Sequence, residues 1–206
     1  TVLFTGSHQS LTSFFNAVKP TLLKETEAIT KNMRQRDGGI LAIELLDSTK
    51  NMANYYQLHV RFETADAMGA NFINSCLEQL AQTLQNEAAN YPHFSKTEKQ
   101  IEVVMSILSN YVPGSRVKAW VSCPIAELGD DGDVLAKKFV QAVEIAHHNT
   151  YRAVTHNKGI MNGVDTLAIA TGNDFRAVEA GIHAYAAKDG NYRGLSKAII
   201  KKDVFL

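Results

Sequence analysis

The chain has 206 residues, of which 45% are hydrophobic and 20% charged, and this is the composition of an ordinary globular protein with room for one or two cores. Twenty-one basic residues balance twenty-one acidic ones, so no overall charge favours nucleic acid or an anionic membrane as a partner. No apolar run approaches the roughly 20 residues that cross a bilayer, and no signal-peptide pattern opens the chain. Two cysteines, Cys76 and Cys123, are too few for a disulfide framework, so the sequence predicts a cytoplasmic protein.

The first half of the chain alternates short apolar runs with amphipathic stretches. Between Ser10 and Arg36, apolar side chains recur every three or four residues, which predicts a helix, and Pro20 inside this pattern predicts a kink or break near Lys19. A second helix is expected to end near Asn90. The expected strands are, in chain order, residues 1–5, 40–46, 55–64 and 101–108. This β-α-β-β-α-β succession is typical of a ferredoxin-like α+β fold.

The second half begins with a predicted strand, Arg116–Ser122. An amphipathic helix is expected from Gly132 to His148, and another from about Asn173 to Ala187. Between these helices, the sequence predicts a polar loop and then an apolar strand, Val164–Ala170. The whole is of the α/β class, with two units that divide near residue 108.

The first segment that could carry chemistry is DAMGAN, residues 66–71. Here a strand ends, a glycine turns the chain and a helix begins, which leaves free backbone amides and a positive dipole end that suit a pyrophosphate. Gly69 would let a ligand approach the backbone closely. The alternative is a plain strand-to-helix turn with Asp66 as the N-cap. No G-x-G-x-x-G motif is present, so an ordinary Rossmann domain is disfavoured.

Two further segments concentrate polar side chains. In residues 151–163, Arg152 could grip a carboxylate, Lys158 could polarise a carbonyl oxygen and Asn162 could orient a ligand, although charges in a loop are more often simply solvated. In residues 170–176, Asp174 stands between a predicted strand and a helix, which suits a functional carboxylate and equally a helix cap.

Taken together, these segments resemble the class II hydroxymethylglutaryl-coenzyme A reductases. The strings that carry the resemblance are DAMGAN at 66–71, ILSN at 107–110, THNKGIMNG at 155–163 and ATGND at 170–174 followed by RAVEAGIHAYAAKDG at 176–190. The similarity is strong from about Arg61 to Leu195 and weak over the first 60 residues.

The resemblance implies a reductase that uses two NAD(P)H to convert hydroxymethylglutaryl-CoA into mevalonate and CoA, or that runs the reverse oxidation. It implies that residues 1–108 are a small NAD(P)-binding domain and that residues 109–206 are part of a larger, mainly helical α/β domain that binds substrate and performs catalysis. It further implies a homodimer or higher homo-oligomer, because the active site of the family lies at a dimer interface.

Residue by residue, the resemblance implies two catalytic groups. Lys158 matches the lysine that stabilises the substrate oxygen as hydride arrives, and Asp174 matches the aspartate hydrogen-bonded near that lysine. The implied substrate-binding residues are Arg152, Thr155, Asn162 and Asn110. The implied cofactor-binding residues are Asp66, Ala67, Met68, Gly69 and Asn71. No metal site is implied.

Two elements of the family have no counterpart in the sequence. These are the glutamate of an E-N-V-I-G-type block and the histidine that protonates the departing CoA thiolate. Because the chain also opens and closes on apolar stretches, the sequence predicts an internal fragment that does not turn over alone. Lys31 and Arg34, where NAD-specific members place an acid, favour NADPH slightly over NADH. Two alternatives remain, a non-catalytic nucleotide-binding or regulatory module and a degenerate reductase kept as a scaffold, the latter disfavoured by intact Lys158 and Asp174.

Overall fold

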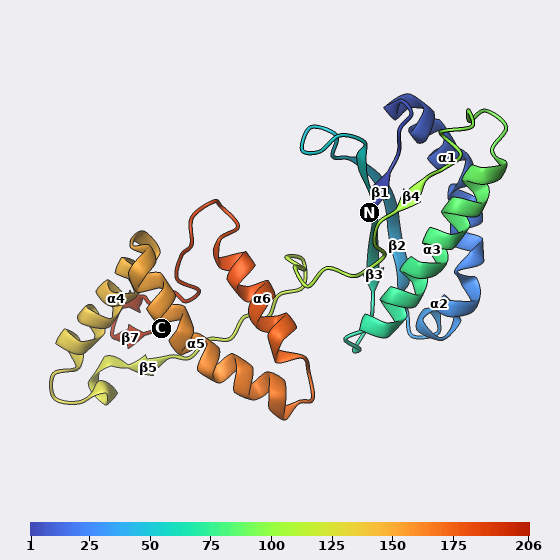
Figure 1. The fold of residues 1–206 in the computed structure, drawn as a ribbon. Coiled ribbons are helices and arrows are strands. Elements are labelled where there is room, and N and C mark those ends of the chain that lie inside the picture. The colour runs from blue at the N-terminus through green and yellow to red at the C-terminus, as the bar shows by residue number, and fades with distance from the viewer. The chain divides into compact units, whose positions relative to one another are not determined.

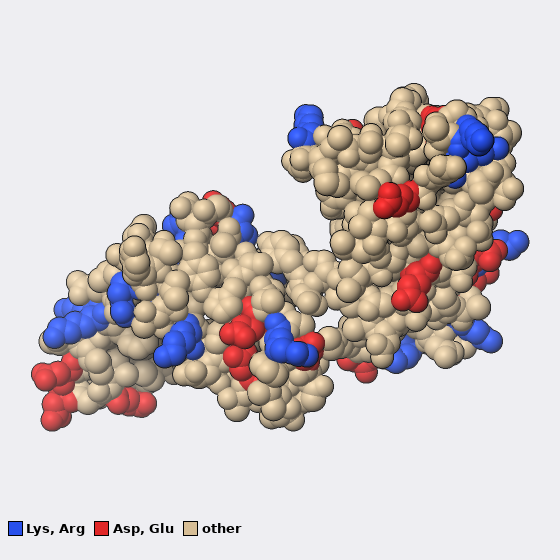
Figure 2. Space-filling model, viewed as in Figure 1, with Lys and Arg blue, Asp and Glu red and all other residues tan.

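The computed structural model describes all 206 residues, which form two compact units, Thr1–Leu108 and Ser109–Leu206 (Figure 1). Each unit combines helices with an antiparallel sheet, which confirms the predicted mixed α/β class. None of the helices is long and apolar enough to cross a membrane. On the face shown in Figure 2, acidic and basic side chains are interspersed, as the balanced charge of the sequence leads one to expect.

The first unit is a four-stranded sheet with three helices on one side (Figure 1). Its strands are β1 (Val2–Leu3), β2 (Gly39–Asp47), β3 (Tyr55–Glu63) and β4 (Glu102–Val103), in the sheet order β2-β3-β1-β4 with antiparallel neighbours throughout. Its helices are α1 (His8–Glu25), α2 (Glu27–Arg34) and α3 (Ala70–Asn90). The predicted succession of strands and helices is present, but β1 and β4 contain only two residues each, so the ferredoxin-like assignment stays a prediction.

Aromatic side chains fill the core between the helices and the sheet. Phe14 of α1 is fully buried, and its ring centroid lies 4.7 Å from that of Phe94 and 5.0 Å from that of Tyr91. The ring of Phe94 also lies 5.3 Å from that of Phe4, which follows β1. Each such buried side chain stabilises the fold by about 1.5–3 kcal/mol. The core therefore ties α1 and the loop after α3 to the start of the sheet.

Of the kink or break expected near Lys19, the break does not occur, because α1 runs through Pro20 to Glu25 and the helix breaks at Thr26 instead. Proline in a helix interior costs about 3 kcal/mol, and this is less than the stabilisation from one continuous apolar stripe. The buried residues of that stripe are Leu11, Phe14, Phe15, Val18 and Leu22. At the break, the fully buried hydroxyl of Thr26 donates to the carbonyl of Leu23 over 2.7 Å.

The turn from β3 into α3 is shaped by Thr64 and Gly69. The Thr64 hydroxyl donates to the carbonyl of Ala67 over 2.7 Å, and the amide of Ala67 donates back to the carbonyl of Thr64 over 3.0 Å. Gly69 is the N-cap of α3, with a left-handed φ of 75°. A Cβ atom on Gly69 would lie 2.5 Å from Cγ2 of Thr64, so this position requires glycine. The alternative that Asp66 caps the helix is wrong.

The second unit packs three helices beside a small sheet. Its strands are β5 (Cys123–Pro124), β6 (Ile200–Lys201) and β7 (Val204–Phe205), in the order β5-β7-β6. A 3-10 turn, η1 (Ile125–Leu128), leads to the helices α4 (Gly132–His148), α5 (Thr150–Ala170) and α6 (Phe175–Ala186). The helix predicted from Gly132 to His148 is confirmed with both ends in place.

The polar loop predicted over residues 151–163 and the strand predicted over Val164–Ala170 are both wrong, because one helix, α5, spans them. The Asn149 side chain caps it by accepting from the amide of Arg152 over 3.1 Å. Its buried positions, Ala153, Asn157, Met161 and Ala168, are spaced by four or seven residues and form one stripe. Burial of this stripe outweighs the loop preference of the local composition.

The strand predicted over Arg116–Ser122 is also wrong. Every residue from Ser109 to Ser122 is exposed, and Val117 and Trp120 keep 99% and 76% of their surface accessible. The segment has strand-forming composition, but no strand of the chain pairs with it and β5 begins only at Cys123. Propensity without a partner strand does not make a sheet.

The segment after α6 is fastened to α4 and α5 by a set of hydrogen bonds. The fully buried Asn157 side chain donates to the carbonyl of Arg193 over 2.9 Å and accepts from the amide of Leu195 over 2.9 Å. Nε2 of His156 lies 2.6 Å from Oγ of Ser196, and Nε2 of His147 lies 2.8 Å from the carbonyl oxygen of Ser196. These contacts hold the chain that leads to the small sheet.

Replacing either of two glycines by alanine should change the stability of the chain, with opposite sign at the two positions. Gly69→Ala should lower the free energy of unfolding by about 1–2 kcal/mol, because alanine is strained at a left-handed φ and its Cβ meets Thr64. Gly163→Ala should raise it by about 0.5–1 kcal/mol, because Gly163 lies inside α5 with open space around it. Urea denaturation of both variants measures this difference. Equal changes at the two positions would contradict the local geometry.

The hydrogen bond of His156 predicts a pH dependence. Burial of the imidazole, helped by the positive charges of His147 and Arg152, lowers the pKa of His156 below its usual 6.5. As the pH falls, His156 of the unfolded chain therefore binds a proton before His156 of the folded chain does. The contribution of neutral His156 to the free energy of unfolding is complete above pH 6.5, and it is lost as the pH falls from 6.5 to the lower pKa of the folded state.

Unfolding free energies measured from pH 5 to 8 should show this loss in the wild-type chain. His156→Gln, which does not titrate and can still bond to Ser196, should flatten the profile. An unaltered profile in His156→Gln would exclude His156 as the source.

Candidate functional site

The candidate cofactor loop lies at the amino end of α3. Gly69 caps this 21-residue helix without any side-chain hydrogen bond, so the amides of its first turn receive no side-chain partner. Met68 and Asn71 are exposed beside this end. Free amides, a helix dipole and a position without a Cβ atom together suit the pyrophosphate of a dinucleotide. The residues present therefore fit the pyrophosphate of a dinucleotide.

An arginine that the sequence did not point to joins this loop. Arg36, which follows α2, forms an ion pair with the Asp66 carboxylate, and its hydrogen bond lowers the pKa of that exposed carboxyl below its ordinary value. The two residues are 30 positions apart, so no local pattern could predict their contact. The pair places a guanidinium beside the amino end of α3.

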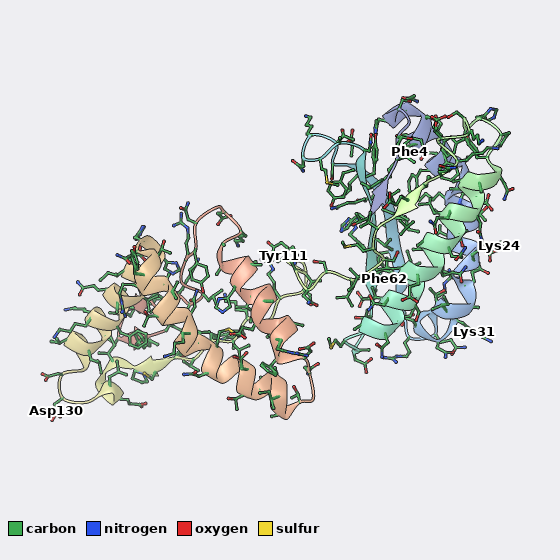
Figure 3. All side chains as sticks on the ribbon, viewed as in Figure 1. Phe4, Lys24, Lys31, Phe62, Tyr111 and Asp130 are labelled. Carbon is green, nitrogen blue, oxygen red and sulfur yellow. The ribbon has the colours of Figure 1, made fainter.

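More positive charge lies on α2. Lys31 and Arg34 are exposed on it, and Figure 3 shows Lys31 at the outer side of the helix. Together with Glu27 and Ala28 they line a shallow surface hollow. A 2′-phosphate bound in this hollow would lie beside the two cations, Lys31 and Arg34.

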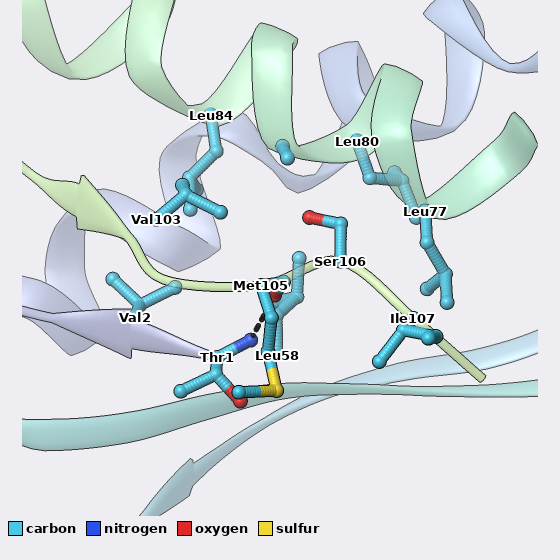
Figure 4. Close-up of a pocket in the computed structure, with 11 residues that line it drawn as sticks. Thr1, Val2, Leu58, Leu77, Leu80, Leu84, Val103, Met105, Ser106 and Ile107 are labelled. Carbon is cyan, nitrogen blue, oxygen red and sulfur yellow. Dashed lines mark hydrogen bonds between the residues drawn. The ribbon is translucent and has the colours of Figure 1, made fainter. Parts of the chain in front are cut away.

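A better enclosed pocket of the first unit lies elsewhere, between α3 and the sheet. Figure 4 shows Leu77, Leu80 and Leu84 of α3 above Leu58 and Val103 of the sheet. Near its edge, the Thr1 amino group donates to the carbonyl of Met105 over 2.9 Å. None of residues 66–71 lines this pocket, and nine of the eleven residues that do line it have apolar side chains. It does not suit the charged parts of a dinucleotide.

In the second unit, α5 carries four of the candidate residues on one face. At 3.6 residues per turn, Arg152, Thr155, Lys158 and Asn162 fall within an arc of about 120°. All four are exposed, and this arc lies opposite the buried stripe of α5. Gly159 lies within this arc and Gly163 at its edge, and neither has another atom near the place where a Cβ would stand, so the surface beside Lys158 is open. The structure thus brings these four residues together.

Asp174 is placed apart from this face. Its Oδ1 caps α6 by accepting from the amides of Arg176 and Ala177 over 3.1 and 3.3 Å, and Nε of Arg176 lies 3.7 Å away. Beyond Lys158, α5 continues for twelve residues to Ala170, which is about 18 Å of helix. The structure of this chain does not bring Lys158 into contact with Asp174.

Asn110 lies beside α6. Its carbonyl oxygen packs against α6, 2.7 Å from where a Cβ of Gly181 would stand. On the same helix, Nδ1 of His183 lies 2.6 Å from the hydroxyl of Tyr192, and Nε2 lies 3.8 Å from Glu179. His183 thus has a hydrogen-bonding partner in Tyr192, within its own unit.

Comparison with known proteins gives one consistent result. The sequence profile of the family described as hydroxymethylglutaryl-coenzyme A reductase matches residues 1–204. The chain is 34% identical over 200 residues to a probable 3-hydroxy-3-methylglutaryl-coenzyme A reductase of Borreliella burgdorferi, covering 95% of this chain and 43% of that protein. It is 32% identical over 188 residues to the reductase of Archaeoglobus fulgidus, covering 88% of this chain and 40% of that one. It therefore spans less than half the length of these relatives.

A solved structure agrees in fold. The class II 3-hydroxy-3-methylglutaryl-CoA reductase of Streptococcus pneumoniae bound to NADPH superposes with a TM-score of 0.75 and 31% sequence identity, covering 99% of this chain and 54% of that one. The resemblance seen in the sequence motifs is confirmed by profile, sequence and structure, and the chain belongs to the hydroxymethylglutaryl-coenzyme A reductase family.

Proposed function

We propose that this chain forms the nicotinamide-binding part and a share of the substrate-binding part of a class II hydroxymethylglutaryl-CoA reductase. The reaction uses two NAD(P)H to convert hydroxymethylglutaryl-CoA into mevalonate and CoA, or runs in reverse. The observation that carries the proposal is the outward face of α5, where Arg152, Thr155, Lys158 and Asn162 gather in a chain of this family.

The two units take different ligands in this proposal. Residues 1–108 hold the dinucleotide at the amino end of α3, with Asp66, Ala67, Met68, Gly69 and Asn71 around it. Residues 109–206 hold the acyl-CoA. The uncapped amides of α3 and the open surface of α5 support this division.

The chemistry requires positive charge where oxygen becomes negative. Hydride supplied by a bound nicotinamide builds negative charge on the carbonyl oxygen, and the Lys158 ammonium stabilises it. Arg152, on the same face, binds the carboxylate of the acyl group with paired donors. Thr155 and Asn162 orient the substrate by hydrogen bonds, and Asn110 adds a further contact.

Asp174 and the oligomer complete the proposal. Because the isolated chain leaves Asp174 with its own helix, its action near Lys158 requires that a ligand or another part of the protein link the two. A homodimer or higher homo-oligomer, located in the cytoplasm, is part of the same proposal. Residues 1–206 alone are not expected to form mevalonate, since the glutamate and histidine of the family have no counterpart in the sequence.

The first test is Lys158→Ala in the full-length protein, assayed for NAD(P)H oxidation on adding hydroxymethylglutaryl-CoA. Turnover should fall by about 100- to 1,000-fold, the usual effect of removing one group that stabilises an oxyanion. Lys138→Ala, an exposed lysine of α4, is the matched control and should keep full activity. If the folded full-length protein showed no turnover with either cofactor, the proposed reductase function would be contradicted. The alternative of a non-catalytic nucleotide-binding or regulatory module would then remain.

The second test concerns the choice of cofactor, for which we propose NADPH. Lys31→Ala and Arg34→Ala should each raise KM for NADPH by about 10-fold or more, the effect of losing a hydrogen bond between charged groups, and leave KM for NADH unchanged. Lys24→Ala on α1, whose side chain is also labelled in Figure 3, is the control. Equal effects on both cofactors, or a wild-type preference for NADH, would contradict this assignment.

A further inference from the structure

Two cations converge on one phenol oxygen in the second unit. Nζ of Lys188 donates to the hydroxyl of Tyr185 over 2.8 Å, and Nη1 of Arg116 donates to the same oxygen over 3.3 Å. Tyr185 belongs to the last turn of α6, Lys188 follows that helix, and Arg116 comes from the segment before β5, 69 residues earlier in the chain. The cluster therefore joins distant parts of the unit.

The cluster has more positive than negative charge. Since both nitrogens bond to a single oxygen, the two cations stand close enough to repel each other. The carboxylate that acts on Lys188 is that of Asp189, its neighbour in the chain. One negative charge therefore stands against the two positive charges of Lys188 and Arg116, and the cluster keeps a net positive charge. Lys188 and Arg116 are exposed and Tyr185 is half-buried, which leaves the cluster open to a ligand.

A helix-terminus explanation accounts for only part of this arrangement. A lysine suits the negative end of α6, and Nζ of Lys188 also lies over the Tyr185 ring, 4.0 Å from its centroid. Neither effect explains Arg116, which belongs to no helix. Moreover, hydrogen bonds from Lys188 and Arg116 lower the pKa of Tyr185 from its ordinary 10.0, as expected where positive charge is in excess.

We propose that Arg116, Tyr185 and Lys188 form a phosphate-binding site. A phosphate monoester would receive paired donors from the guanidinium, a point charge from the ammonium and a hydrogen bond from the phenol proton, which the two N–H donors leave free. The choice of natural ligand rests on the proposed function: in the unit assigned to acyl-CoA, the matching group is the 3′-phosphate of coenzyme A. Inorganic phosphate has the same chemistry.

The test is a titration of the full 206-residue chain, followed by NMR on ring-labelled tyrosine, with Tyr185→Phe to assign the Tyr185 signal. The probes are inorganic phosphate, CoA and dephospho-CoA, which lacks the 3′-phosphate, each against sodium chloride at equal ionic strength. Phosphate and CoA should shift the Tyr185 signal saturably, and dephospho-CoA should not. Lys188→Ala and Arg116→Ala should each raise Kd by about 10-fold or more.

The matched control is Lys118→Ala, an exposed cation two residues after Arg116, which should leave Kd unchanged. No saturable shift with phosphate, or equal weakening by Lys118→Ala and Lys188→Ala, would overturn the site. Saturable phosphate binding with no discrimination between CoA and dephospho-CoA would support the phosphate site and overturn its assignment to CoA. Because the readout is binding, it is independent of reductase turnover, and the two proposals can fail separately.

Discussion

The buried amide of Asn157 fixes the rotation of α5, and the outward direction of the candidate residues follows from it. Its oxygen and nitrogen are both bonded to the backbone of residues 193–195, and a buried amide that lost these partners would cost about 1–3 kcal/mol for each unpaired group. Any turn of α5 about its axis would break both bonds. Lys158, the next residue along the helix, is thereby held about 100° away from the interior.

In the first unit, the position of the candidate ligand-binding groups depends on the turn before α3 and not on a buried amide. There the turn before α3 closes through Thr64 and Ala67, and Gly69 alone allows the helix to start where it does. The amides of α3 are left without side-chain partners because the cap is a residue without a side chain. In both units, groups that could meet a ligand stand on a helix whose position is determined by buried contacts, so little rearrangement is required of the backbone.

The sequence predicted those elements whose pattern is local. The strands β2 and β3, the helix α4 with both its ends, and the glycine turn that leads into α3 can all be recognised from spacing and turn residues, and a helix cap was one of the two roles that suited Asp174. Prediction from the sequence failed where contacts between distant parts of the chain determine the secondary structure. Residues 150–170 have a loop-like content of glycine and asparagine, and only packing against α4 and the segment at 193–196 makes them one helix.

The same distinction holds for the candidate site. The motifs identified Lys158 and Asp174 as a related pair, but spacing along a chain does not report distance in space, and the structure holds them apart. Arg36 at the candidate cofactor loop and Arg116 beside Tyr185 carried no signal in the sequence, because each owes its position to a residue at least 30 positions away. Long-range ion pairs of this kind leave no periodic trace in a sequence.

The exposed run from Ser109 to Ser122 has a practical consequence. Fourteen consecutive residues without burial, including Arg116 and Lys118, offer a trypsin-like protease an extended substrate before either core has opened. Limited proteolysis would then cut near the division between the units and release the first one, with its own aromatic core, as a separate folded piece. The segment 109–122 is therefore the place at which the chain can be divided for separate structural studies of its two units.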